Sequence, residues 1–176
     1  KFQERNREER KRLFRRIARW AMGVALFAFF VWWIAQKIAF QPGGATPNLG
    51  NEHIDAIDAP HASYNSIPPT SGPHVGNIAS WGVHTEPIPD ELQIHNLEDG
   101  GVMVQYNCEL LQQEKACENL VEQLRAIVER FPSEVLLAPY PKLDEALALT
   151  AWNRIDKWTP LVRDDGTVIF DAKRVK

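Results

Sequence analysis

The sequence predicts an α+β protein: one N-terminal transmembrane helix, then a small mixed α/β periplasmic domain with a long irregular loop region. Three observations predict it. One uncharged apolar run lies near the N-terminus, one amphipathic helical pattern lies in the second half, and short apolar runs flank that pattern. The 176 residues divide into a basic cytoplasmic tail, a transmembrane helix, a linker and the domain, at 1–19, 20–40, 41–51 and 52–176.

The apolar run over 20–35 contains neither charge nor proline. Extended to residue 40 it has 21 residues, and at about 1.5 Å per residue it spans roughly 31 Å, the thickness of one bilayer core. Aromatic residues near its ends suit the two interfaces, and a lysine near its end can extend to the headgroups. These anchoring residues are Trp20, Trp32, Trp33 and Lys37. A cleaved signal peptide is the alternative, but the run is longer than a signal core and no A-x-A site follows.

Charge is divided sharply along the chain. Residues 1–19 carry a net charge of +6 and residues 41–176 a net charge of −10, and no Lys or Arg lies between Lys37 and Lys115. The positive-inside rule therefore predicts a cytoplasmic N-terminus and a periplasmic domain at a bacterial inner membrane. The net positive charge lies outside the acidic domain, which excludes a nucleic-acid partner and leaves membrane lipid as one expected partner.

Residues 41–51 are rich in Pro, Gly and Asn, which indicates a linker. Residues 52–99 have neither period 2 nor period 3.6 and are expected to be ordered but irregular. Beyond them the pattern predicts a strand, a helix ended by Pro132 and a second strand, at 101–106, 110–131 and 134–138. Residues 145–151 fit a strand or a short helix, and 162–170 fit a hairpin at Asp165-Gly166 or a loop leading to a helix.

The side chains of the domain that could bind a metal ion are concentrated before the first predicted strand. From Ile38 to Glu114 there is no Lys or Arg, but there are ten carboxylates and all five histidines of the chain. Imidazoles and carboxylates are ligands for first-row transition metals, and such a region attracts cations. The alternative is that the histidines bond loop carbonyls or face water. No motif of a nucleophilic, nucleotide-binding or zinc-dependent enzyme is present, so we expect no enzyme.

Cys108 and Cys117 are the two cysteines of the chain. In an oxidising compartment their spacing favours a disulfide, worth roughly 2–3 kcal/mol through loop entropy. Two free core thiols, or one soft copper ligand, are the alternatives.

The motifs YNSIPPTSGPH, WG, HNLEDGG, AP-x-P and LTAW, between about His53 and Trp152, resemble an uncharacterised prokaryotic family called domain of unknown function 3105. Its members are membrane-anchored with an outward-facing domain. The resemblance implies a metal cluster at His53, His74, His95 and position 99, where this chain has Asp99 in place of the family's histidine. A carboxylate at that position favours a harder metal or none.

From these features we expect a single-span, non-catalytic accessory subunit of a larger membrane complex, respiratory or photosynthetic. Its partners would be the other subunits of that complex. Small residues of the anchor allow close approach of neighbouring helices, and these are Ala21, Gly23, Ala25 and Ala28. A periplasmic protein that binds copper or another transition metal is the alternative.

Overall fold

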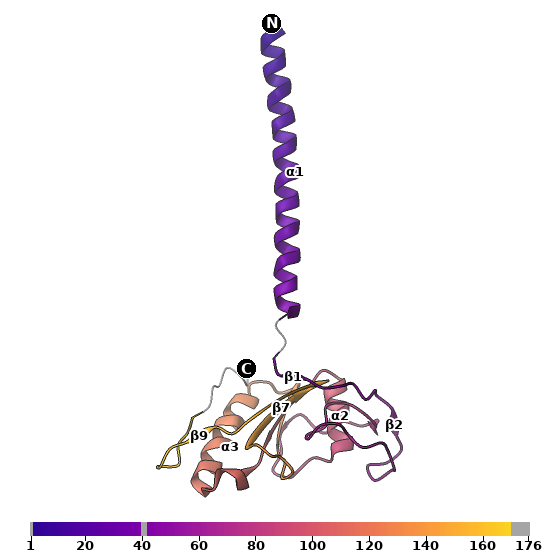
Figure 1. Ribbon diagram of the computed structural model, residues 1–176, viewed down its shortest axis with the longest axis vertical. Helices are drawn as coiled ribbons and strands as arrows, with labels where there is room; N and C mark the ends of the chain where they lie inside the picture. The colour runs from indigo at the N-terminus through magenta and orange to yellow at the C-terminus, as the bar shows by residue number, and fades with distance from the viewer. Residues whose placement is uncertain (1, 40–41, 170–176) are drawn as a thin grey trace. The chain divides into compact units, whose positions relative to one another are not determined.

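A computed structural model describes residues 2–39 and 42–169 (Figure 1). It divides into two units, one up to residue 41 and one from Pro42 onward. Expectations that involve Phe40, Gln41, residues 170–176 and the side chain of Lys37 lie outside the described residues.

The first unit is a single helix, α1 (Phe2–Ala39). It covers the basic segment as well as the predicted span, and an 18-residue window within its segment Arg10–Gln36 has a mean hydropathy of 1.7. The helix is long and apolar enough to cross a membrane, although a signal sequence near an N-terminus meets the same criteria. On this helix Trp20 is 78% exposed and Trp32 is 56% exposed.

The second unit is a mixed α/β domain, as the sequence predicts. Its central sheet has the strand order β1-β8-β7-β5-β6-β4, with β5–β6 and β4–β6 parallel and the other pairs antiparallel. The elements are β1 (Gly44–Ala45), β2 (His53–Ile54), β3 (His74–Val75), β4 (Gly82–Val83), α2 (Asp90–Glu98), β5 (Val102–Tyr106), the 3₁₀ helix η1 (Cys108–Leu111), α3 (Glu114–Val128), β6 (Val135–Pro139), β7 (Leu147–Ala151), β8 (Arg154–Trp158), β9 (Leu161–Val162) and β10 (Val168–Ile169).

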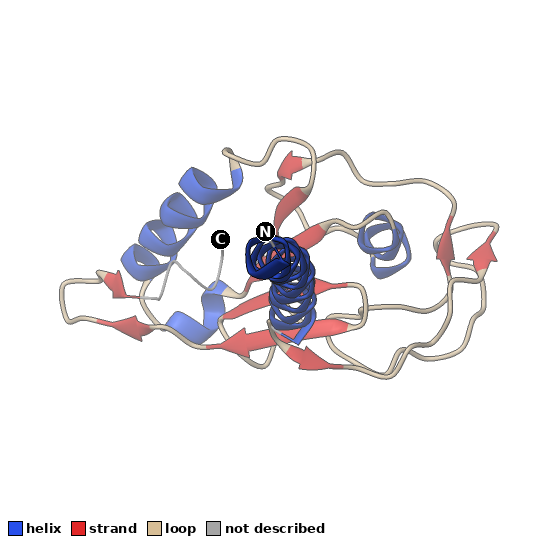
Figure 2. Ribbon diagram, turned by 90° about the horizontal axis from the view of Figure 1, so that it is seen from above, coloured by secondary structure: helices blue, strands red, loops and turns tan. Residues whose placement is uncertain are grey.

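Each face of the sheet carries one helix. Val104 and Leu137 pack with α3 in one core cluster, whereas their neighbours Met103 and Leu136 pack with Leu97 of α2 in another. Because successive strand residues point to opposite faces, α2 and α3 cover opposite sides of β5 and β6 (Figure 2). The strands predicted at 101–106 and 134–138 are confirmed, since burial on both faces produces continuous apolar runs.

The linker expected at 41–51 is corrected for its described residues, because residues from Pro42 onward belong to the domain. β1 pairs with β8, and the amide of Leu49 donates to Ser71 Oγ at 3.0 Å. Gly43 has a φ of 74°, and a Cβ there would lie 2.9 Å from the carbonyl oxygen of Ile155. Gly43 and Gly44, which suggested flexibility, instead allow close packing against β8.

The helix expected at 110–131 is also shorter than predicted. Gln112 has a φ of 56°, which separates η1 from α3, and α3 ends at Val128, before Pro132. Residues 147–151 form a strand rather than a helix, and 161–169 form the hairpin option of the two that the sequence left open.

The segment 52–99, expected to be irregular, contains one helix that the sequence pattern missed. The buried face of α2 includes Gln93 and Asn96 beside Ile94 and Leu97, so it lacks an apolar stripe. Asn96 exchanges two hydrogen bonds with the backbone of Ala79, each 2.9 Å long. Polar residues that are paired in this way stabilise a helix that hydropathy does not reveal.

Candidate metal centre

Three imidazoles and one carboxylate converge at one end of the domain. The ligand atoms of His53, His74, His95 and Glu98 all lie within 4.8 Å of one another. The three ring centroids are 4.9, 5.2 and 5.2 Å apart. The structure therefore brings together the three histidines that the resemblance implied, although they lie 21 residues apart along the chain.

Strand pairing places the first two rings. β2 and β3 run parallel, with His53 directly opposite His74. The amide of His74 donates to the carbonyl of Glu52 at 2.9 Å, and the amide of Gly72 donates to that of Gly50 at 3.0 Å. His74 is fully buried, because the loop that carries it packs against the segment after β1.

Helix α2 supplies the other two groups. His95 and Glu98 lie three residues apart and therefore share one face of the helix. The Nδ1 atom of His95 is 3.0 Å from the carbonyl oxygen of Val75, which directly follows His74. This bond ties α2 to β3 beside the cluster.

Backbone carbonyls fix which nitrogen of two rings faces the cluster. Nδ1 of His74 lies 2.8 Å from the carbonyl oxygen of Gly72, and Nδ1 of His95 is bonded in the same way to Val75. A carbonyl only accepts hydrogen bonds, so both Nδ1 atoms carry the proton. In a neutral ring the lone pair is then on Nε2, which is the arrangement of metal-binding histidines.

Glu98 is held from the opposite side. Its Oε1 accepts a hydrogen bond of 2.6 Å from Nδ2 of Asn51, while its Oε2 lies 2.9 Å from Nε2 of His74. The Asn51 bond, with a smaller contribution from His74, outweighs the cost of desolvation and holds the pKa of Glu98 below its usual range. The carboxylate is therefore charged at neutral pH.

The contact between His74 and Glu98 requires a positive species. Nδ1 of His74 already donates to a carbonyl, so a neutral ring would direct a lone pair at the charged carboxylate. Either a proton between Nε2 and Oε2 or a metal ion at Nε2 resolves this contact.

The structure groups Glu98 with the three histidines, in place of Asp99, the carboxylate named from the resemblance. Asp99 is the C-cap of α2, and its side chain is 50% exposed. Its Oδ2 lies 3.9 Å from Nε2 of His95 but is not in the group of mutually close ligand atoms. The sequence signal for Glu98 is its spacing of three residues from His95. This spacing places the two side chains on one face only if the segment is a helix, and the sequence pattern did not predict α2.

A family model described as "Protein of unknown function (DUF3105)" matches residues 58–163, well over half of the chain. The chain belongs to this family. The match contains His74, His95 and Glu98, whereas His53 lies five residues before it. No curated protein and no solved structure matches the chain.

The two other histidines of this DUF3105 chain lie outside the cluster. Nε2 of His61 is 3.2 Å from Oε1 of Glu91, and Nε2 of His84 is 2.7 Å from the carbonyl oxygen of Ser80. His61 has a pKa above its usual value, mainly because its ring bonds the carbonyl of Ala62, with Glu91 adding to the effect. Both histidines therefore make ordinary contacts, and they provide matched controls for the cluster.

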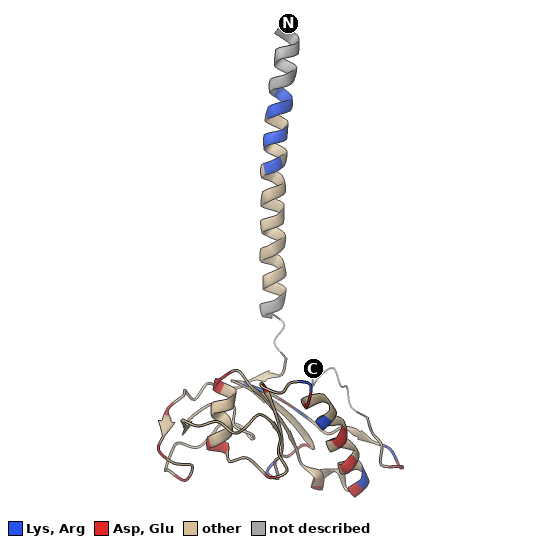
Figure 3. Cartoon of the chain, turned by 180° about the vertical axis from the view of Figure 1, so that it is seen from behind, with Lys and Arg blue, Asp and Glu red and all other residues tan. Residues whose placement is uncertain are grey.

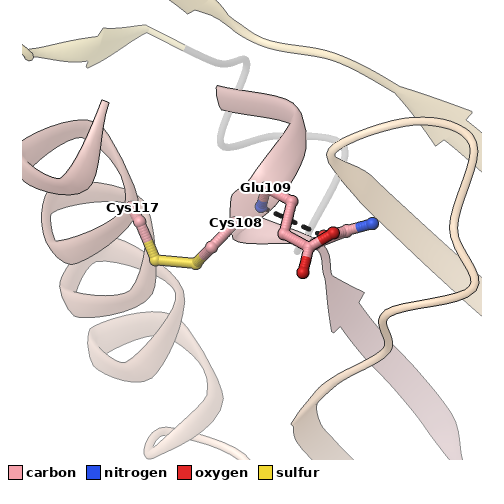
Figure 4. The surroundings of a disulfide bond; sticks show 4 residues. Cys108, Glu109 and Cys117 are labelled. Atoms are coloured by element: carbon pink, nitrogen blue, oxygen red, sulfur yellow. Dashed lines mark hydrogen bonds between the residues drawn. A yellow bond between two sulfur atoms is a disulfide. The ribbon is translucent and has the colours of Figure 1, made fainter. Parts of the chain in front are cut away.

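The two cysteines of the DUF3105 domain are joined to each other. The disulfide Cys108–Cys117 links η1 to α3, and its Cα atoms lie 5.2 Å apart, within the usual range (Figure 4). Of the three readings that the sequence left open, the structure contains the disulfide. Neither sulfur is available as a thiolate ligand for the histidine cluster.

Proposed function

We propose that the protein is a membrane-anchored metal-binding protein. In this proposal His53, His74, His95 and Glu98 bind one first-row divalent transition metal ion, Cu²⁺ or Zn²⁺. The observation that carries it is the pair of Nδ1–carbonyl bonds, which leave Nε2 of His74 and His95 for the cluster, where Nε2 of His74 lies 2.9 Å from Oε2 of Glu98. Imidazole nitrogen with one carboxylate oxygen is a ligand set that suits these two metals.

The spacing of the ligand atoms is close to what such an ion needs. Bonds of about 2.1 Å in a tetrahedral site separate ligand atoms by about 3.4 Å, and here the separations reach at most 4.8 Å. A contraction of at most about 1.4 Å closes the site at those bond lengths. His53 has the most exposed side chain of the three histidines, at 56%, and so has the most freedom to move.

The proposed location is the extracytoplasmic side of the membrane. In the described part of α1, basic residues precede the apolar segment, whereas the domain carries many carboxylates (Figure 3). The positive-inside rule then puts the N-terminus in the cytoplasm. The disulfide supports the same assignment, because such bonds persist in oxidising compartments.

Metal titration of the full chain in detergent tests the proposal. We expect one equivalent of Co²⁺, used as a spectroscopic substitute for Zn²⁺, to give the absorption bands of a nitrogen- and oxygen-ligated ion. Zn²⁺ should displace it. The variants His53→Ala, His95→Ala and Glu98→Gln should lose this site, while His61→Ala and His84→Ala should retain it. Full-length protein that binds no Co²⁺, Zn²⁺ or Cu²⁺ stoichiometrically would refute the proposal.

Association with a larger membrane complex stays a prediction. It is checked by native electrophoresis of membranes solubilised in mild detergent, with and without the gene. An unchanged pattern of complexes together with a monomeric protein would count against the accessory role.

A further inference from the structure

The cluster contains no sulfur ligand, and the chain has little sulfur to offer it. The sequence has two methionines and two cysteines. Met103 is fully buried in the core between α2 and the sheet, Met22 lies on α1, and both cysteines are in the disulfide. Thioether and thiolate sulfur are the ligands that select Cu⁺, whereas imidazole and carboxylate suit Cu²⁺.

We infer that the centre retains copper as Cu²⁺ and releases it on reduction to Cu⁺, with Glu98 as the residue that sets this preference. The inference rests on the proposed function and adds a redox dependence to it. Among divalent ions of the first row, Cu²⁺ forms the tightest complexes with nitrogen and oxygen ligands. Reduction removes one positive charge from an ion that faces the charged carboxylate of Glu98.

Acidic surroundings strengthen the same preference. Oδ2 of Asp99 lies 3.9 Å from Nε2 of His95, so a second carboxylate lies beside the cluster. Residues 38–114 contain no Lys or Arg, so the segments that carry the cluster bring no fixed cation of their own. Neighbouring negative charge stabilises a doubly charged ion more than a singly charged one.

The release step needs a one-electron donor for each ion. With ascorbate as the donor, two Cu²⁺ ions take two electrons from one ascorbate monoanion. The products are two Cu⁺ ions, one dehydroascorbate and one proton, and no protein side chain is oxidised. The exposed side chain of His53 provides the way out, since its detachment opens the site without unfolding the domain.

Comparing the affinities of the full chain in detergent for the two copper ions tests the inference. Cu²⁺ is titrated against a chelator of known affinity in air, and Cu⁺ against bicinchoninate under anaerobic conditions. We expect binding of Cu²⁺ to be at least about tenfold tighter than binding of Cu⁺, and ascorbate to transfer the bound copper to bicinchoninate. Circular dichroism checks that the wild-type protein and the two Glu98 variants described next are folded.

Two substitutions at position 98 separate the effect of the ligand's charge from the effect of a soft sulfur ligand. Glu98→Met puts a thioether of similar length into the site, and it should weaken Cu²⁺ binding and strengthen Cu⁺ binding. Glu98→Gln should weaken Cu²⁺ binding without strengthening Cu⁺ binding. Wild-type protein that binds Cu⁺ as tightly as Cu²⁺, or a Glu98→Met variant with unchanged preference, would overturn the inference while leaving metal binding intact. Protein that binds neither copper ion would overturn the inference, and it would refute the proposed function as well if it also bound no Zn²⁺ or Co²⁺.

Discussion

His53 and His74 face each other across the parallel pair of β2 and β3, with their ring centroids 4.9 Å apart. The pair has only two residues in each strand. Two backbone hydrogen bonds from Gly72 and His74 to the segment 50–52 hold it in register. The geometry of the cluster therefore depends on the residues around these strands as much as on the ligands, and the first two predictions address those residues.

Asn51 is expected to act as a positioning residue for Glu98. Its side chain donates to Oε1 of Glu98 at 2.6 Å and leaves Oε2 facing the histidines. Asn51→Ala should lower Zn²⁺ affinity by about 10–100-fold, as loss of a partner behind a ligand generally does. Competition with a chromogenic chelator measures this. Asn65→Ala, which removes an exposed bond to the carbonyl of Pro47, is the control and should leave affinity unchanged.

Asn96 is expected to be a main contributor to the stability of the region around α2. It is fully buried and satisfies both the amide and the carbonyl of Ala79. Asn96→Ala would leave these two groups without partners and should lower the free energy of unfolding by about 2–4 kcal/mol. Urea denaturation followed by tryptophan fluorescence gives the value. The exposed variant Asn48→Ala, which loses only a bond from the amide of Gly50, should change it by less than about 1 kcal/mol.

The tyrosines predict a loss of stability at high pH. Burial is the main cause that raises the pKa of Tyr64, Tyr106 and Tyr140 above its usual value. The hydroxyls of Tyr64 and Tyr140 also donate to Pro73 and Asp90, bonds that the phenolate forms cannot make. The stabilisation is thus complete below the unfolded pKa of about 10 and decreases as the pH rises above it.

Urea denaturation at about pH 8 and about pH 11 tests this dependence, together with phenolate absorbance of the native protein. We expect little phenolate signal until the domain unfolds. Tyr140→Phe should reduce the difference in stability between the two pH values. A native protein that develops the full phenolate signal near pH 10 would contradict the prediction.

The disulfide is expected to stabilise the domain without affecting the metal centre. Cys108 and Cys117 close a loop of nine residues, which corresponds to about 2–3 kcal/mol in the loop-entropy model. The double variant Cys108→Ser, Cys117→Ser should lose this amount in urea denaturation. Its Zn²⁺ affinity should be unchanged, because α3 and the histidine-bearing α2 lie on opposite faces of the sheet. A parallel loss of metal binding would show that the two regions are coupled.

Strong local patterns made much of the fold predictable. The uncharged run of α1, the apolar strands β5 and β6 and the amphipathic face of α3 each carry their own periodic signal. Helix α2 lacks such a signal, because Gln93 and Asn96 occupy its buried face and are paired with groups distant in sequence. Its hydropathy therefore resembles that of a loop.

The candidate site was predictable in its histidines but not in its carboxylate. A resemblance in sequence named His53, His74 and His95, whereas the choice between Glu98 and Asp99 depends on where α2 ends and on the bond from Asn51. The segment 42–51 was misjudged for a related reason. Gly43 and Gly44 fit close to β8, and a segment that uses glycine in this way has the same composition as a flexible linker.

The equal spacing of the three histidines has a consequence for the unfolded chain. An ion bound by His53, His74 and His95 would close two successive loops, each spanning 21 residues of sequence. Such cross-links reduce the conformational entropy of the unfolded state. The first loop, between β2 and β3, contains no helix or strand. Metal loading should therefore protect residues 55–73 from proteolysis more than any other part of the domain, so that a protease would report how much of the protein carries an ion.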